Sequence, residues 1–143
     1  TELLDIYYQR SWATFTEKEQ KINFHTHSQS NISFAYYLLK PENSGGIIFK
    51  SNELQNELAK NIFTSSKLEK SLINKANVYN SDKSMFDPIQ DTIIIFPSKT
   101  PHATVPNRSG LPRISISGDI SIMLKDSKGF EHLMPNFSNW TKF

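Results

Sequence analysis

Apolar and polar residues alternate along two neighbouring stretches of the chain, residues 113–117 and residues 120–123. The first reads Arg-Ile-Ser-Ile-Ser and the second reads Ile-Ser-Ile-Met. Successive side chains of a β-strand point to opposite faces of its sheet, so a period of two predicts a strand with two chemically different faces. We therefore expect both stretches to be strands.

Three further stretches are apolar enough to form strands. Residues 32–39 are rich in aromatic and apolar side chains, residues 47–49 follow a Pro-Glu-Asn-Ser-Gly-Gly turn sequence, and residues 92–96 end at Pro97. Short strands joined by turns, without alternating helices, favour an all-β fold. A jelly roll fits this pattern, because its two packed sheets leave a cavity between them.

Two segments depart from the alternating pattern. Residues 52–80 carry apolar residues at every fourth position near their start, which predicts one helix within a polar insert. Residues 125–143 place a few aromatic residues on a polar background and are expected to form an irregular tail packed over the body. At 143 residues the chain has the length of one domain, so we expect a single domain over residues 1–143.

Composition narrows the choice of partners. The chain has 16 Lys and Arg residues against 14 Asp and Glu residues, so its formal net charge is +2. This charge is too small to imply nucleic acid or an anionic membrane as the partner. The sequence contains no cysteine, which excludes disulfide scaffolds, thiolate zinc sites, iron–sulfur clusters and cysteine nucleophiles.

The sequence also lacks the patterns that direct a chain to a membrane. No apolar stretch approaches the roughly 18 residues needed to span a bilayer. The first residues lack the basic start and apolar centre of a signal peptide. We therefore expect a soluble protein of the cytoplasm.

The histidines are the first candidates for chemistry. His25 and His27 are two residues apart, so on an extended strand both imidazoles project from the same face, about 7 Å apart at the backbone. That geometry allows both to bind one metal ion, although polar surface strands also carry such pairs. His132 has no partner at a useful spacing and is expected to lie on the surface.

His102 and Arg113 lie on either side of a turn-rich segment. If the two flanking segments form a hairpin, His102 lies opposite Ser115 and Thr104 lies opposite Arg113. Directly opposed residues share a face, so all four side chains would point the same way. A slip of one residue would turn Arg113 and Ser115 to the other face.

On that face Arg113 would be buried between the sheets. A buried guanidinium requires an anion, and its planar fork suits a carboxylate bound through two hydrogen bonds. Asp119 and Glu42 are the protein carboxylates that could serve, and a bound carboxylate ligand is the more economical partner. The alternative is an arginine at the sheet edge with its guanidinium in water.

Several of these residues belong to short motifs that follow one another in order. The motifs are His25-Thr26-His27, Tyr36-Tyr37-Leu38, Ser44-Gly45-Gly46-Ile47, Phe96-Pro97, His102 and Arg113-Ile114-Ser115. Their order and spacing resemble the iron(II)- and 2-oxoglutarate-dependent oxygenases, above all a small family of bacteria and phages with His-x-His. The layout is also similar to that of prolyl hydroxylases. The resemblance extends from about residue 23 to residue 117.

The resemblance implies a double-stranded β-helix fold and a set of metal ligands. His25 and His102 would ligate Fe(II), and His27 would occupy the position at which most of the superfamily has Asp or Glu. Three imidazoles can keep the same open positions on the metal. With three neutral ligands the centre keeps a charge of +2, whereas a carboxylate ligand would reduce it to +1.

The resemblance also implies a site for the cosubstrate. Arg113 would pair with the distal carboxylate of 2-oxoglutarate, Ser115 would lie beside it on the same strand face, and Tyr37 would add a phenol hydrogen bond. Tyr36 would point the other way, because adjacent strand residues alternate. Both tyrosines could equally be core aromatic residues.

The resulting hypothesis is a hydroxylase, a dioxygenase that uses Fe(II) and 2-oxoglutarate to oxidise an unknown small-molecule or peptide substrate. The expected location is then the cytoplasm of a bacterium or of a phage-infected host cell. Two alternatives fit the same residues. One is a cupin-like dioxygenase with three histidine ligands that binds its substrate directly to the metal. The other is a non-catalytic jelly roll, a binding or virion-associated protein.

Overall fold

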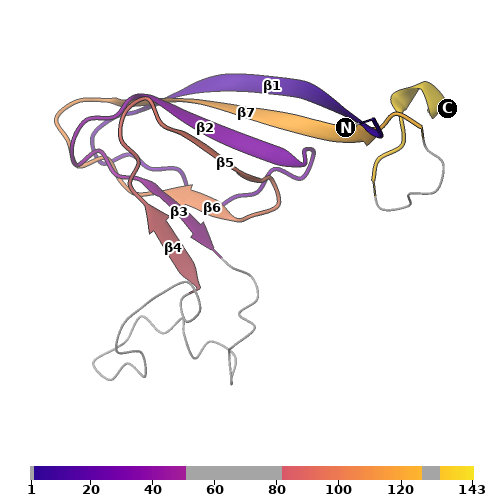
Figure 1. Ribbon diagram of the computed structural model, residues 1–143. Helices are drawn as coiled ribbons and strands as arrows, with labels where there is room; N and C mark the ends of the chain where they lie inside the picture. The colour runs from indigo at the N-terminus through magenta and orange to yellow at the C-terminus, as the bar shows by residue number, and fades with distance from the viewer. Residues whose placement is uncertain (1, 51–81, 127–132) are drawn as a thin grey trace, which may run out of the picture.

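A computed structural model describes residues 2–50, 82–126 and 133–143 (Figure 1). These residues form seven strands and one short 3-10 helix, which in chain order are β1 (Leu4–Thr16), β2 (Ile32–Leu39), β3 (Ile47–Lys50), β4 (Lys83–Phe86), β5 (Ile93–Pro97), β6 (His102–Thr104), β7 (Arg113–Leu124) and η1 (Phe137–Asn139). The all-β prediction is therefore confirmed for the part of the chain that the structure describes.

The strands form two antiparallel sheets. The larger sheet has the order β1-β7-β2-β5, and the smaller sheet has the order β4-β3-β6. In Figure 1 the larger sheet lies above the smaller one, with its long strands β1 and β7 at the top. Side chains from both sheets line one pocket between them, as the jelly-roll prediction required.

The alternation at residues 113–123 is confirmed, but the two predicted stretches are one continuous strand. β7 pairs with β1 on one side and with β2 on the other, which places it at the centre of the larger sheet. Arg113, Ser115 and Ser117 line the pocket, and Asp119 hydrogen-bonds to Ser33 on β2. The odd-numbered residues of β7 therefore point inward, and its isoleucines point outward.

β1 was not predicted from the sequence, although it is the longest strand. The pairing of β1 with β7 shifts between Tyr8 and Arg10, so Gln9 is an extra residue in a β-bulge. A bulge moves the following side chains to the opposite face relative to a regular strand. The period of two is therefore broken in the middle of β1, and the alternation is hidden.

The predicted hairpin between the His102 and Arg113 segments is wrong. β6 pairs with β3 in the smaller sheet, whereas β7 lies in the larger sheet. The connecting segment crosses between the sheets and is anchored by Asn107, whose fully buried amide donates to the carbonyls of Thr16 and Leu111 at 2.8 Å each. A connection tied down in this way crosses the molecule rather than forming a tight turn.

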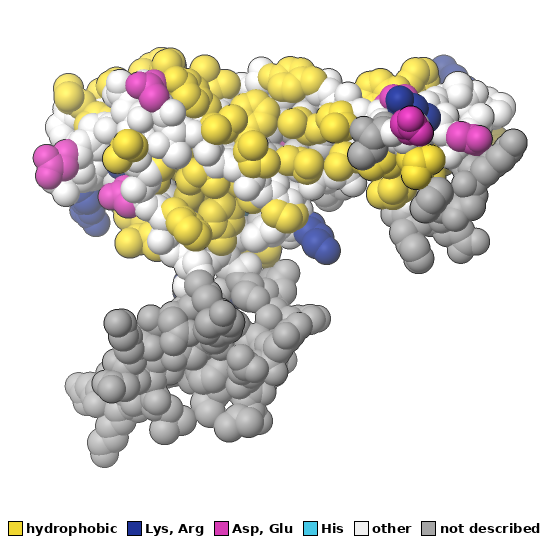
Figure 2. All heavy atoms as spheres, viewed as in Figure 1, with side chains coloured by type: hydrophobic (Ala, Val, Ile, Leu, Met, Phe, Trp, Pro, Cys, Tyr) yellow, Lys and Arg dark blue, Asp and Glu magenta, His cyan; other side chains and the backbone are white. Residues whose placement is uncertain are grey.

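The outward face of the larger sheet carries large apolar side chains. Six that are 46% to 71% exposed are Ile6, Tyr8, Phe15, Leu38, Ile93 and Ile95. Hydrophobic side chains gather over the upper part of the molecule in Figure 2, where these strands lie. The interior by contrast contains few fully buried apolar residues and many buried polar ones.

Two predicted features fall partly or wholly outside the described residues. The predicted insert at residues 52–80, with its helix, lies wholly outside them, and so does His132. The described part of the tail contacts the strands: the carbonyl of Met134 accepts from the N–H of Leu124 in β7, and the ring of Phe137 lies edge-on to that of Tyr7 in β1, with centroids 5.9 Å apart. No helix among the described residues is long and apolar enough to cross a membrane.

Candidate functional site

Two of the histidines are brought together by backbone pairing. The segment that carries His25 runs antiparallel beside β6, and His25 and His102 exchange both backbone hydrogen bonds at 3.0 Å. Thr104 extends the pairing, since its Oγ1 accepts from the N–H of Ile22 at 2.8 Å and its own N–H donates to the Ile22 carbonyl. Directly opposed residues place their side chains on the same face, so the two imidazoles meet.

His27 joins this pair, although it belongs to no strand. Its N–H donates to the carbonyl of Ser98 at 3.0 Å, which fixes the backbone where β5 ends. The ring centroids of His25 and His102 are 4.3 Å apart, and each lies 5.1 Å from that of His27. One ligand nitrogen from each residue lies within 4.8 Å of the other two. The structure thus brings together all three histidines that the sequence singled out.

Each imidazole is held through its Nδ1 atom. His25 and His102 each place Nδ1 2.9 Å from the backbone carbonyl oxygen two residues earlier in the chain. His27 places Nδ1 2.6 Å from Oδ1 of Asp119. All three partners are hydrogen-bond acceptors, so each Nδ1 carries a hydrogen, and in the neutral form of the ring Nε2 is the nitrogen that keeps a lone pair. Three neutral imidazoles that present Nε2 form a donor set for a divalent transition metal.

Burial also keeps His102 neutral. Desolvation is the largest effect on this residue and lowers its pKa to about 4, while the hydrogen bond to the Thr100 carbonyl opposes the shift. Its ring packs edge-on against Phe96, with centroids 4.7 Å apart, and Phe96 in turn packs against Phe49 at 4.9 Å. This aromatic wall excludes water from one side of the imidazole, so His102 is a neutral ligand at neutral pH.

A buried carboxylate stands behind His27. Asp119 is fully buried, and its Oδ1 accepts hydrogen bonds from His27 Nδ1 and from the Ser33 hydroxyl at 2.8 Å. Its Oδ2 accepts from Nε of Arg10 at 2.8 Å. Burial alone would raise the pKa of Asp119, but the hydrogen bonds from His27, Ser33 and Arg10 outweigh it and hold the pKa below its usual value. The carboxylate is therefore ionised at neutral pH.

Arg113 is buried, as predicted, and only 2% exposed. Its Nη1 donates to the carbonyls of Ser44, Gly45 and Val105 at 2.6, 2.9 and 3.2 Å. Gly45 permits this approach, because it has a φ of +77° and a Cβ there would lie 2.7 Å from the Val105 carbonyl oxygen. The turn that begins at Pro41 thus holds the guanidinium in place.

The protein carboxylates considered for Arg113 do not pair with it. Asp119 binds His27 and Arg10, and Glu42 is exposed. Within the described residues no carboxylate forms an ion pair with Arg113, and the acidic side chain that acts on it electrostatically, Asp87, is itself paired with Lys40 at 2.8 Å. Burial lowers the pKa of Arg113, but a guanidinium stays protonated in proteins. A buried positive charge is left for an anionic ligand.

Tyr37 and Ser115 lie on the inner face near Arg113. The two are directly opposed across β2 and β7, and both line the pocket. Burial raises the pKa of Tyr37 to about 12, against the lowering effect of the Arg113 charge, so the phenol keeps its proton. Tyr36 points the other way, as expected, and donates from its hydroxyl to Asp91 Oδ1 at 2.7 Å.

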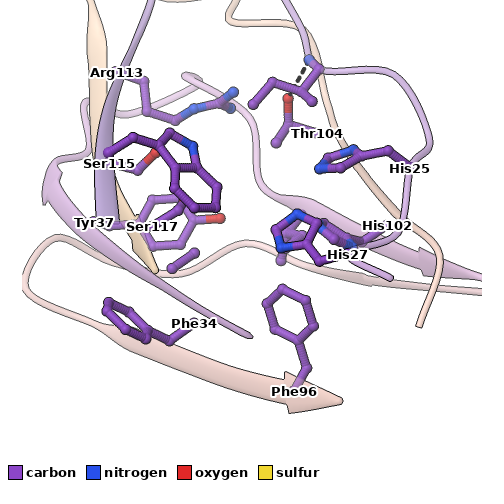
Figure 3. A pocket seen from close by; sticks show the side chains of 14 residues that line it. His25, His27, Phe34, Tyr37, Phe96, His102, Thr104, Arg113, Ser115 and Ser117 are labelled. Atoms are coloured by element: carbon purple, nitrogen blue, oxygen red, sulfur yellow. Dashed lines mark hydrogen bonds between the residues drawn. The ribbon is translucent and has the colours of Figure 1, made fainter. Parts of the chain in front are cut away.

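One pocket between the sheets contains all six predicted site residues. Figure 3 shows Arg113 on one side of this cavity and the three histidines on the other, with the Tyr37 hydroxyl pointing into the space between them. Ile22, Ile47 and Phe96 add apolar walls. The pocket therefore combines metal-ligating nitrogens at one end with a fixed cation at the other, separated by a partly apolar space.

The residues that support the histidines lie outside the predicted site. The sequence indicates Asp119 only as a possible partner of Arg113, and it does not single out Ser33, Arg10 or Trp12. The ring of Trp12 lies 5.6 Å from that of His27, and the Arg10 guanidinium lies 5.2 Å from the Trp12 ring. The alternation of β7 could have found Asp119, because it places residues 113, 115, 117 and 119 on one face.

A family model described as "Putative 2OG-Fe(II) oxygenase" matches residues 10–119 of the chain. The matched stretch includes all six predicted site residues together with Asp119. No curated protein matches the chain in sequence.

Solved structures of oxygenases have the same fold. A 2OG-Fe(II) oxygenase family oxidoreductase from Burkholderia pseudomallei has a TM-score of 0.58 at 14% identity, over 82% of this chain and 45% of that one. AviO1 from Streptomyces viridochromogenes Tue57 has 0.54 at 9% identity, over 81% and 51%. The non-heme monooxygenase ThoJ, in a nickel complex, has 0.54 at 8% identity, over 92% and 56%.

These similarities confirm the double-stranded β-helix fold. The chain spans about half the length of the structures that it matches.

Proposed function

The chain belongs to the 2OG-Fe(II) oxygenase family, whose members use Fe(II) and 2-oxoglutarate, and from this premise we propose that it is a hydroxylase with a three-histidine iron centre. In this proposal His25, His27 and His102 ligate Fe(II). Arg113, Ser115 and Tyr37 bind the distal carboxylate of 2-oxoglutarate. The substrate is a small molecule or a peptide.

The observation that carries the proposal is the shared tautomer of the three converging imidazoles. Each Nδ1 is occupied by an acceptor, so each Nε2 is available to a metal. The ligand atoms of all three lie within 4.8 Å of one another, a separation that small side-chain rotations reduce to that of ligands on one ion. Imidazole nitrogens suit iron and other divalent transition metals. The residues present therefore fit the metal of the family.

The other end of the pocket fits a dicarboxylate. Arg113 carries a buried charge without a carboxylate partner among the described residues, and it is fixed by three backbone carbonyls. Tyr37 remains a hydrogen-bond donor over the physiological pH range, because its pKa is about 12. A fixed guanidinium and a protonated phenol are suitable donors for one carboxylate group.

When bound, Fe(II) and 2-oxoglutarate supply the oxidising chemistry, which couples decarboxylation of the cosubstrate to succinate with oxidation of the substrate. The protein's own residues bind and orient. Arg113 fixes the distance between the anion and the metal ligands, and the aromatic wall of Phe96 and Phe49 keeps water from His102. Such an enclosure limits side reactions.

Binding measurements test the two halves of the site separately. Equilibrium dialysis with Mn²⁺, which does not activate oxygen, should give one ion per chain, and calorimetry should then detect binding of 2-oxoglutarate to the loaded protein. We expect Arg113→Ala to weaken 2-oxoglutarate binding by at least about tenfold, since a hydrogen bond to a charged group contributes about 1.5–3 kcal/mol. Metal binding should be unchanged.

Arg108→Ala is the matched control, because Arg108 is an exposed arginine that pairs with Glu19. It should leave both affinities unchanged. If Arg113→Ala retains its metal and binds 2-oxoglutarate as the parent does, the cosubstrate site is wrong. Arg113→Lys keeps the charge and is the second variant if the alanine variant does not fold.

Product analysis separates the hydroxylase from the dioxygenase that binds its substrate directly. With Fe(II), oxygen and 2-oxoglutarate, the proposed enzyme should form succinate in an amount equal to the 2-oxoglutarate lost. Oxygen consumption with a substrate but without loss of 2-oxoglutarate would support the direct-binding reaction instead. A chain that binds no iron, manganese or zinc would support the non-catalytic jelly roll.

A further inference from the structure

His27 is supported in a different way from the other two histidines. His25 and His102 place Nδ1 against backbone carbonyls, which are neutral acceptors. His27 places Nδ1 against the carboxylate of Asp119, at the short distance of 2.6 Å. The one imidazole that stands where most of the superfamily has a carboxylate is therefore the one backed by a carboxylate.

Asp119 is held tightly in that position. It is fully buried and accepts hydrogen bonds on both oxygens, from Ser33 and His27 on Oδ1 and from Arg10 on Oδ2. Ser33 is fixed in turn by the Ser98 hydroxyl at 2.8 Å. Because the Ser33 proton goes to Asp119, its oxygen is left to accept from Ser98 and from His27 Nδ1, which lies 3.0 Å away. The network leaves the carboxylate one orientation.

The register of the larger sheet places this network at the metal site. Asp119 lies opposite Ser33 on β2 and opposite Arg10 on β1, so all three residues project from the inner face beside His27. The β-bulge at Gln9 restores Arg10 to that face. Three strands thus contribute to one network, in which Ser33 and Asp119 contact His27 Nδ1 and Arg10 contacts Asp119.

The net charge of the metal centre explains why a carboxylate behind His27 is useful. Three neutral imidazoles leave the full +2 charge on a bound cation, whereas a metal-ligating carboxylate would reduce it to +1. A carboxylate hydrogen-bonded to a metal-binding histidine raises the basicity of the imidazole and fixes its orientation. The negative charge behind His27 also attracts the cation, because Asp119 is fully buried whereas the Arg10 side chain that pairs with it is 52% exposed and screened by water.

From this geometry, and resting on the metal centre of the proposed function, we infer that Asp119 is a positioning residue for the metal. It holds His27 as the Nδ1–H tautomer with Nε2 facing the cation. It also supplies, next to the centre, the negative charge that the three-histidine ligand set lacks. Asp119 does not itself touch the metal. It acts through His27, and Arg10 and Ser33 hold it in place.

Metal affinity tests the inference without catalysis. In Asp119→Asn the shape is kept, but the charge is lost and an amide N–H can face His27 in place of an acceptor. We expect the affinity of the chain for Co²⁺ to fall by about 10–100-fold, with a changed visible absorption spectrum of the bound ion. The matched control is Asp91→Asn, which removes a carboxylate that pairs with Tyr36 outside the pocket, and it should leave both the affinity and the spectrum unchanged.

Repeating the Asp119→Asn substitution in a His27→Asp variant distinguishes a positioning role of Asp119 from a purely structural one. In His27→Asp there is no imidazole to orient, and a carboxylate at position 27 lies close to Asp119. Adding Asp119→Asn to this background should therefore not weaken Co²⁺ binding, and the relief of repulsion should strengthen it. An equal loss of affinity in both backgrounds would show that Asp119 only maintains the fold, and it would overturn the inference.

A direct measurement on the parent chain covers the case in which Asp119→Asn does not fold. In the Zn²⁺-loaded, ¹⁵N-labelled protein, a slowly exchanging proton should be bound to Nδ1 of His27. Its absence would contradict the inference. A parent chain that binds neither Co²⁺ nor Zn²⁺ would overturn the proposed function itself, whereas unchanged Co²⁺ binding by Asp119→Asn beside a functional parent would overturn only the role of Asp119.

Discussion

The two faces of the larger sheet differ in chemistry, and the buried face is the more polar one. The inner face carries buried polar and charged side chains, among them Ser33, Arg113 and Asp119. The outer face carries apolar side chains that are exposed, such as Ile6 at 71% and Ile95 at 64%. In most sheets with one solvated face, the apolar side chains point to the core and the polar ones to water.

This difference shows what the interior of this protein is built for. A cavity lined by imidazoles, a guanidinium and a carboxylate requires polar residues on the inner face, each with hydrogen-bond partners inside the protein. The inner rows of β7 and β2 meet this requirement, while the apolar rows of the same strands contribute little to the buried core. Alternation in a sequence therefore establishes that a strand has two different faces, but not which face lies inside.

The largest expected effect comes from removing an inner-face ligand. His102→Ala should reduce the affinity for Mn²⁺ by more than about 100-fold, because loss of a direct ligand exceeds the 10–100-fold cost of changing a supporting residue. Dialysis and metal analysis measure this. Phe24→Ala, next to His25 and 44% exposed, is the control and should bind the ion as the parent does. Tight binding by His102→Ala would exclude the three-histidine centre.

Acid should lower the stability of the protein through His102, which lines the pocket on the inner side of the larger sheet. His102 has a folded pKa of about 4 against an ordinary value of 6.5, so the unfolded chain binds more protons between these pH values. The free energy of unfolding of the metal-free protein should therefore fall as the pH decreases from about 6.5 to about 4, by at most about 3 kcal/mol from this group.

Urea unfolding at several pH values measures this effect. His102→Asn should have a smaller pH dependence than the parent over the same interval. Asp119, whose pKa is held below its usual value, contributes stability that is lost only at still lower pH. Equal pH dependence in the parent and in His102→Asn would show that His102 does not titrate as expected.

A side chain added to the outer face at Gly118 should have an intermediate effect. A Cβ there would lie 2.5 Å from ring atoms of Phe34 and 3.1 Å from the carbonyl oxygen of Arg10. Gly118→Ala should therefore lower the free energy of unfolding by about 1–3 kcal/mol, the usual cost of overpacking. Gly110→Ala has no atom within 4 Å of the new Cβ and should be neutral or stabilising. Denaturant unfolding of both variants makes the comparison.

The smallest effect is expected from polar substitutions on the exposed outer face. Ile95→Thr keeps β-branching and removes apolar surface from a side chain that is already 64% exposed, so the free energy of unfolding should change by no more than about 0.5 kcal/mol. Binding of a hydrophobic dye should decrease, because exposed apolar area is lost. A large loss of stability would mean that Ile95 is buried in solution.

The fold was predicted where the strand pattern is regular and missed where it is interrupted. The strand at residues 32–39 and the two stretches 113–117 and 120–123, which form one strand, were predicted from apolar runs and alternation, whereas β1 was hidden by its bulge at Gln9. The partner of β6 could not be deduced, because the buried amide of Asn107 determines the path of the connection and has no signature in the periodicity. Local patterns predict strands but do not fix their partners.

The residue types and motifs predict the residues that line the site, but not the residues that hold them in place. His25, His27 and His102 are candidates because imidazoles bind metals, and the order of the motifs adds Arg113, Ser115 and Tyr37. Long-range contacts place Asp119 beside His27, 92 residues away in the chain. A single sequence does not reveal that proximity, although the alternation of β7 places Asp119 and Arg113 on the same face.

The extra residue at Gln9 shows how this sequence can and cannot change. Because β7 lines the candidate site with one row of side chains and carries isoleucines in the other row, inserting or deleting one residue between Arg113 and Asp119 would exchange the serines and isoleucines and disrupt the site. Insertions or deletions of two residues would preserve the two rows. We expect relatives that differ in length within this strand to differ by even numbers, or to carry a compensating bulge like the one that returns Arg10 to Asp119.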